Sequence, residues 1–164
     1  MDLGISSRVA PILEQVKTFI ADRILPVEDE FFTEIDVGDR WSLTPRQVEI
    51  METLKSQARE QGLWNFFLTG EEGSGLNTVE YAYLAEEMGK SHLAAEAFNC
   101  SAPDTGNMEV LHKYGSEAQK KQWLEPLLSG EIRSAFSMTE PGVASSDATN
   151  ICTEAVLDGD QWVI

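Results

Sequence analysis

The sequence predicts a mainly α protein, with a helical domain over residues 1–131 followed by the beginning of a β domain over residues 132–164. Two observations indicate this fold class. Apolar residues recur every three or four positions as far as Gly130, which is the spacing of amphipathic helices. After Gly130 the spacing falls to two, the period of a β-strand. Helix-starting and helix-stopping residues divide the first part into about five helices.

The first two helices are placed by their capping residues. Ser7 is expected to cap a helix whose apolar face begins at Val9, and the proline in Ile24–Pro26 is expected to stop or kink it. A second helix begins at Thr44, because a Thr cap, a proline and a glutamine three residues on together form a capping box. Gly62 is expected to end this helix.

Three further helical regions follow. Thr78 is expected to cap a helix that ends at Gly89, and another region covers residues 92–114 with an interruption around "NCSAPDTGN". Residues 116–119 form a second capping box, which begins a helix that Gly130 closes.

The β part is expected to contain strands over residues 132–138 and 151–157. The "DGD" of residues 158–160 predicts a hairpin turn, and "QWVI" begins the returning strand. So few strands leave their edges unpaired. We therefore interpret the chain as the N-terminal fragment of a longer protein.

Composition narrows the class of function. The net charge is −16 with a pI of about 4.3, which disfavours nucleic acid or an anionic membrane as partner. Two cysteines, Cys100 and Cys152, are too few for a disulfide framework, and His92 and His112 are isolated from other metal ligands. We expect no metal site, no membrane span and no secretory signal, and hence a cytoplasmic location.

The segment "TEPGVASSD" has the chemistry of a ligand-binding loop. Thr139 can donate a hydrogen bond to a ligand, and Pro141–Gly142 turns the backbone sharply. The run Val143–Asp147 offers backbone N–H groups and two hydroxyls suited to a diphosphate. Flavin adenine dinucleotide (FAD) has both a hydrogen-bonding ring and a diphosphate. On composition alone, a simple surface loop remains an alternative.

The amino-acid sequence of this region resembles that of the acyl-CoA dehydrogenase family. "MTEPGVASSDATNI", following "EAQKKQWLEPLLSGEIRSAF", is similar to the subgroup of acyl-CoA dehydrogenase family members 10 and 11. "GLWNFFL" and "AEAFNCSAPDTGNMEVLHKYG" resemble the same subgroup, and the likeness covers essentially all of residues 8–164. The commonest family form has Gly-x-Gly-Ser-Asp, whereas residues 142–147 are one residue longer and lack the second glycine.

The resemblance implies a site for FAD within one segment. Met138 and Thr139 would place backbone and hydroxyl against the pyrimidine side of the flavin and its N5. Ser146 would contact the pyrophosphate and lie close to the acyl-CoA substrate, while Asp147 would order the loop. The full set of residues implied to bind FAD is Phe136, Met138, Thr139, Gly142, Ser145 and Ser146.

The resemblance also implies a reaction, the oxidation of an acyl-CoA to the trans-2-enoyl-CoA in fatty acid β-oxidation. The carboxylate base would lie in a C-terminal domain outside these residues, so no catalytic residue is assigned. Glu140 is expected to be solvated or to brace the loop. The implied partners are an electron-transfer flavoprotein and further copies of the chain, as a dimer or tetramer. Two alternatives stay open: a non-enzymatic helical interaction module and, ranked last, an acyl-CoA oxidase.

Residues 98–107 resemble the helix break that walls the acyl pocket in this family. The small side chains of Ser101, Ala102 and Gly106 would leave room for a long or branched acyl chain, or would only permit close helix packing. The remaining large aromatic residues are expected to be core: Trp64, Phe66, Phe67 and Trp123.

Overall fold

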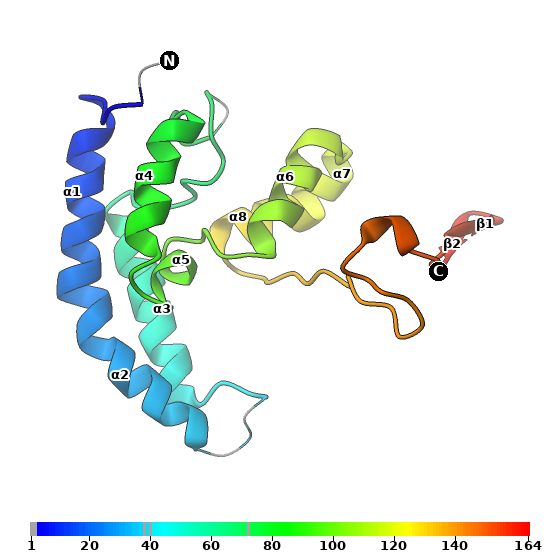
Figure 1. Cartoon of the computed structure of the whole chain (residues 1–164), viewed down its shortest axis with the longest axis horizontal. Coiled ribbons are helices and arrows are strands. Elements are labelled where there is room, and N and C mark those ends of the chain that lie inside the picture. Colours follow the sequence, from blue (N-terminus) through cyan, green and yellow to red (C-terminus); the bar gives the residue numbers. More distant parts are fainter. Residues whose placement is uncertain (1–2, 38, 40, 72) are drawn as a thin grey trace. The chain divides into compact units, whose positions relative to one another are not determined.

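The computed structural model describes residues 3–37, 39, 41–71 and 73–164. The chain forms two compact units, one reaching Ser134 and the other running from Ala135 to Ile164 (Figure 1). The first unit is helical, and the only strands among the described residues lie in the second. The mainly α prediction is therefore confirmed. No helix within the described residues is both long and apolar enough to cross a membrane.

A long bent rod begins the helical unit. It consists of α1 (Val9–Phe19), a π-helical turn (Ile20–Ile24) and α2 (Leu25–Thr33). Pro26 does not stop the helix, because the π turn precedes it and gives the chain a wider turn where the proline lacks an N–H. A second π turn (Lys120–Leu124) precedes Pro126 in the same way and leads into α8 (Glu125–Ser129).

Capping boxes fix the starts of α3 (Pro45–Glu60), α4 (Thr78–Met88) and α7 (Glu117–Gln119). Thr44 and Gln47 form the predicted capping box of α3. Ser116 and Gln119 likewise form the predicted box of α7. Gly62 and Gly130 adopt left-handed φ values of 70° and 75° after α3 and α8, as a C-terminal stop requires.

Two predicted caps were wrong by one residue. The cap of α4 (Thr78–Met88) is Asn77, whose side chain accepts a hydrogen bond from the backbone N–H of Glu80. In α1 the hydroxyl of Ser6, not that of Ser7, accepts from the N–H of Val9 at 3.1 Å. In both places two adjacent polar residues are able to cap, and only the register of the first turn decides between them.

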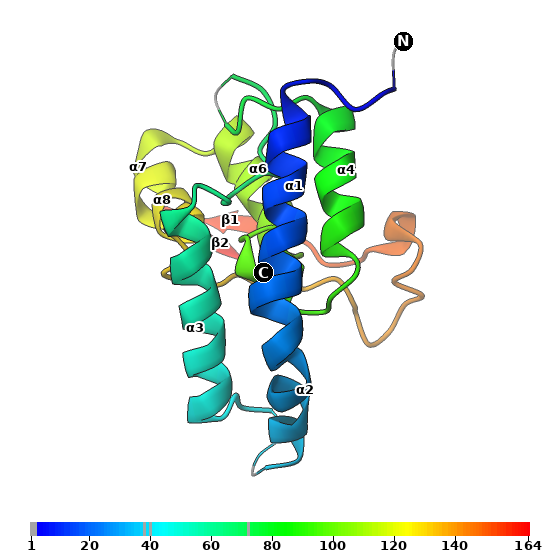
Figure 2. The ribbon, with the colours of Figure 1, turned by 90° about the vertical axis from the view of Figure 1, so that its left-hand side faces the viewer.

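The core lies among the helices. α1 lies beside α4, and α2 packs against α3 (Figure 2). Phe98 is fully buried, and its ring centroid lies 5.3 Å from that of Phe19 and 6.1 Å from that of Phe66. Phe67 is buried too, and Trp64 is partly buried. The expectation that Trp123 belongs to the core was wrong, because it is 48% exposed.

The remaining elements complete both units. A 3-10 turn (Glu34–Asp36) follows α2. The interruption between α5 (Ala94–Ala97) and α6 (Asp104–Tyr114) covers residues 98–103, so it ends earlier than the predicted one, whose last four residues lie in α6. In the second unit, a 3-10 turn (Ala148–Asn150) leads to β1 (Val156–Asp158) and β2 (Gln161–Val163). The two strands pair antiparallel, with Val156 opposite Val163, and Gly159 takes a φ of 65° in the predicted hairpin turn.

The strand expected over residues 132–138 is absent, and that expected over 151–157 is reduced to its last residues in β1. The alternating pattern is present in both segments, but a strand also needs a hydrogen-bonded neighbour. Among the described residues, only the hairpin supplies one.

Candidate functional site

The segment implied to bind FAD lies in the second unit and is open to solvent. Phe136 is 64% exposed and Met138 is 54% exposed. Thr139, Gly142 and Ser146 are exposed as well, and Ser145 is half-buried. An aromatic ring and a methionine exposed to this extent present apolar surface that a planar ligand would cover.

Glu140 braces this segment. Its carboxylate accepts hydrogen bonds from the hydroxyl of Thr153 at 2.6 Å and from the N–H groups of Cys152 and Thr153. The Thr153 hydroxyl and these N–H groups lower the pKa of Glu140 below its usual value. The expectation that Glu140 braces the loop is therefore confirmed.

Asp147 holds the following turn. Its carboxylate accepts from the N–H of Thr149 at 3.0 Å and from the Thr149 hydroxyl at 2.7 Å. These bonds, the hydroxyl first, lower the pKa of Asp147. Asp147 thus orders the loop, as expected.

The two neighbouring serines differ. The Ser145 hydroxyl accepts a hydrogen bond from the N–H of Glu140 at 2.8 Å, so it closes the turn within the protein. The hydroxyls of Thr139 and Ser146 are exposed and make no hydrogen bond to any residue that the structure describes. Together with that of Ser137, which is also exposed, they are the hydroxyls of this segment that a ligand can engage directly.

The backbone between these hydroxyls is also available. Within the described residues, the consecutive N–H groups of Gly142–Ser146 donate no hydrogen bond, whereas those of Glu140 and Asp147 on either side do. Successive free N–H groups in a turn favour an anion. Donors of this kind would suit an anionic group such as a diphosphate.

In the helical unit, a carboxylate clamp that sequence reasoning missed holds the last residues before this segment. Asp104, the first residue of α6, accepts from the N–H of Ser134 at 2.7 Å and from its hydroxyl at 2.5 Å. Its other oxygen accepts from Nε of Arg133 at 2.6 Å. Burial raises the pKa of Asp104, but the bonds from Ser134 and Arg133 outweigh burial and lower it.

The segment implied to wall an acyl pocket connects α5 to α6. Cys100 is buried here, and burial raises the pKa of its thiol to about 11, which makes it unreactive at neutral pH. Gly106 is exposed, and a side chain added at its Cβ position would meet nothing within 4 Å. Among the described residues, no closely packed helix explains the glycine at position 106.

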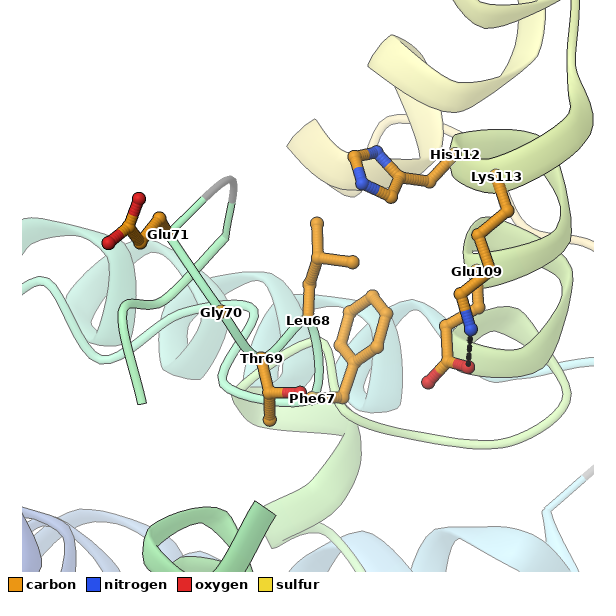
Figure 3. Close-up of a pocket in the computed structure, with 8 residues that line it drawn as sticks. All are labelled: Phe67, Leu68, Thr69, Gly70, Glu71, Glu109, His112 and Lys113. Atoms are coloured by element: carbon orange, nitrogen blue, oxygen red, sulfur yellow. Dashed lines mark ion pairs between the residues drawn. The ribbon is translucent and has the colours of Figure 1, made fainter. Parts of the chain in front are cut away.

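The helical unit also contains a pocket of about 400 Å³ between the loop after Phe67 and α6 (Figure 3). Lys113 and Glu109 of α6 form an ion pair at 3.8 Å on one side of it, and Glu71 lies on the loop side. None of the residues implied to bind FAD lines this pocket.

Comparison with known proteins gives the family. Residues 9–131 match the model of the acyl-CoA dehydrogenase N-terminal domain. Over 97% of its length the chain is 48% identical to acyl-CoA dehydrogenase family member 10 of Mus musculus. It is 52% identical, over 93% of its length, to family member 11 of Homo sapiens. It is also 46% identical over its whole length to a probable acyl-CoA dehydrogenase, FadE2, of Mycobacterium tuberculosis.

A solved structure from Mycobacterium abscessus matches 97% of the chain with a TM-score of 0.85 and 49% identity. The chain spans 16%, 19% and 40% of the three named relatives and 40% of that solved chain. It therefore corresponds to a part of each relative. On the match to residues 9–131, this chain belongs to the acyl-CoA dehydrogenase family and contains its N-terminal domain.

Proposed function

We propose that this chain is the N-terminal part of a FAD-dependent acyl-CoA dehydrogenase that oxidises an acyl-CoA to the trans-2-enoyl-CoA. The observation that supports the proposal is the run of backbone N–H groups from Gly142 to Ser146 that donate no hydrogen bond among the described residues. They lie in a segment with the sequence motif of the family. Bound FAD supplies the acceptor for the β-hydride. An electron-transfer flavoprotein is the proposed partner, and the complete protein is proposed to form a dimer or tetramer.

The residues of this chain bind and orient. The Thr139 hydroxyl would donate to the flavin ring, and Ser146 with the neighbouring N–H groups would hold the diphosphate and lie near the acyl-CoA. Glu140 is unsuited to remove the α-proton, because three donors occupy its carboxylate and lower its pKa. On the family resemblance, the base is proposed to come from a C-terminal domain outside these residues, and no catalytic residue is assigned in this chain.

Flavin content tests the proposal. The 164-residue chain and the complete gene product that carries this sequence would be purified side by side, and flavin absorbance recorded after gel filtration. We expect the complete product to be yellow and to be bleached by an acyl-CoA. A complete product that is colourless and takes up no added FAD would contradict the proposal and favour the non-enzymatic interaction module.

A pair of serine variants locates the site. Ser146→Ala removes an exposed hydroxyl without a protein partner, and we expect FAD affinity to fall about fivefold to tenfold. Ser7→Ala is the matched control, because Ser7 is also exposed, its hydroxyl makes no hydrogen bond among the described residues, and it lies outside the segment implied to bind FAD. Equal affinity in both variants would place the cofactor elsewhere.

A further inference from the structure

The clamp formed by Asp104, Arg133 and Ser134 belongs to a larger network of charges. The guanidinium of Arg133 also donates to Glu96 of α5 at 2.6 Å, and Lys55 of α3 reaches the same Glu96 oxygen at 2.7 Å. The side chains of Lys55 and Asp104 are only 7% and 5% exposed. A buried charge is costly unless an opposite charge is hydrogen-bonded to it. The acidic and basic side chains of this network pair with one another and together hold residues 133–134 to three helices.

The clamp ends where the FAD-binding segment begins. Only Ala135 separates Ser134 from Phe136, and residues 133–140 belong to no helix or strand. Hydrogen bonds from side chains, and not those of a helix or sheet, must therefore fix the backbone here. If a residue of this segment is not held in one backbone conformation, FAD binding must order it. The entropy lost on ordering one residue weakens binding by a factor of roughly 5 to 30.

We propose that Asp104 is a positioning residue for the cofactor: by holding Ser134 and Arg133, it fixes the start of the segment that binds FAD and so sets FAD affinity. This inference rests on the proposed function. Asp104 touches neither flavin nor substrate in this account. It acts by ordering the backbone at the start of this segment before FAD binds. Without Asp104, FAD would have to order that backbone itself, which would reduce the free energy of binding.

The chain contains a matched control for this carboxylate. Glu80 is also buried and has the same set of donors as Asp104: an arginine (Arg8), a serine hydroxyl (Ser6) and a backbone N–H. It lies in α4, and none of its partners belongs to residues 133–147. Asp104→Asn and Glu80→Gln therefore remove comparable interactions, and only the first disturbs the clamp.

The experiment measures FAD dissociation constants of the complete gene product by flavin fluorescence, together with melting temperatures. We expect both variants to lower the melting temperature, and only Asp104→Asn to raise the dissociation constant, by about tenfold. Ser134→Ala keeps the N–H but removes the hydroxyl, which donates to Asp104 and accepts from Nδ2 of Asn107 at 2.8 Å. It should weaken FAD binding in the same direction and gives a second test if Asp104→Asn does not fold.

Four outcomes would contradict the account, and the failure of the inference is distinguishable from that of the proposed function. An unchanged dissociation constant in Asp104→Asn would contradict it directly. Equal weakening by Glu80→Gln would show only a general loss of stability. Wild-type protein that binds no FAD would contradict the proposed function itself. Hydrogen exchange of residues 133–140, faster in Asp104→Asn and unchanged in Glu80→Gln, supports the clamp independently of flavin, and unchanged exchange in both contradicts it.

Discussion

Asn65 and Asn99 both adopt left-handed backbone conformations, with φ values of 56° and 53°, and their side chains are hydrogen-bonded to each other at 2.7 Å. Both amides also reach the end of α8: Asn65 donates to the carbonyl of Leu128 at 2.9 Å and Asn99 to that of Leu127 at 3.0 Å. Asparagine tolerates positive φ better than other non-glycine residues. This pair therefore turns two loops sharply and joins both to one helix terminus.

Asn99→Ala should destabilise the helical unit by about 2–3 kcal/mol, because it removes the hydrogen bonds of the buried amide to Asn65 and to the Leu127 carbonyl and strains the backbone. Asn99→Gly removes the same amide but tolerates positive φ, so it should cost roughly 1 kcal/mol less. Urea unfolding measures both free energies. If the alanine and glycine variants prove equally stable, the backbone strain argued for Asn99 is wrong.

The corrected cap of α4 predicts an asymmetry between two adjacent residues. Asn77→Ala should cost about 1 kcal/mol, because the N–H of Glu80 loses its acceptor. Thr78→Ala should be nearly neutral, because Thr78 is exposed and its hydroxyl makes no hydrogen bond among the described residues. Thermal melts of the two variants test this, and the reverse order of stability would restore Thr78 as the cap.

The ion pair of Glu80 predicts a pH dependence of stability. Hydrogen bonds from Arg8, then Ser6 and the Asn77 N–H, lower the pKa of Glu80 from an ordinary value of 4.5 to about 2. Because the folded-state pKa is depressed, its contribution is complete above the unfolded pKa and is lost as the pH falls toward the folded one.

Glu80→Gln should therefore melt below the wild type at pH 7, and the gap should close between about pH 5 and pH 2. Melting temperatures of both proteins across this range provide the measurement. A gap that does not change with pH would mean that the Glu80 carboxylate makes no charge-dependent contribution.

Glycine at position 106 is expected to make the helix less stable than alanine would at the same position. It lies in α6, is exposed and has open space at its Cβ position, so Gly106→Ala should stabilise the helix by about 0.5–1 kcal/mol. If this face contacts an acyl chain, the same variant should lower kcat/KM for long-chain acyl-CoA in the complete protein.

Gly130→Ala is the opposite control for Gly106→Ala. Its φ is 75°, and an added Cβ would lie 3.0 Å from the ring of Trp64, so the variant should be destabilised. Calorimetry of the two variants compares them, and destabilisation by Gly106→Ala would show that the space at this position is not open.

What the sequence predicted well is local. Apolar spacing and the capping boxes at Thr44 and Ser116 identified helices because their partners lie within three or four residues. The missed features are long-range: Asp104 and Ser134 are 30 residues apart, and Asn65 and Asn99 are 34 apart. Nothing in the spacing of such residues indicates that they meet.

The candidate site was predicted from the sequence of its motif. The structure adds a difference between two serines that the sequence does not show. Ser145 and Ser146 are identical as residues, but the first is used by the Glu140 N–H and the second is not. That division depends on how the turn closes. The role of each residue in binding FAD stays a prediction.

Hydrogen–deuterium exchange of the complete gene product, with and without FAD, tests the central claim most directly. The account predicts that FAD slows exchange across residues 142–146, whose N–H groups would then donate to the diphosphate, and leaves the pocket between residues 67–71 and α6 unchanged. Bound flavin with unaltered exchange at residues 142–146 would contradict it, because the cofactor would then be held by another part of the protein.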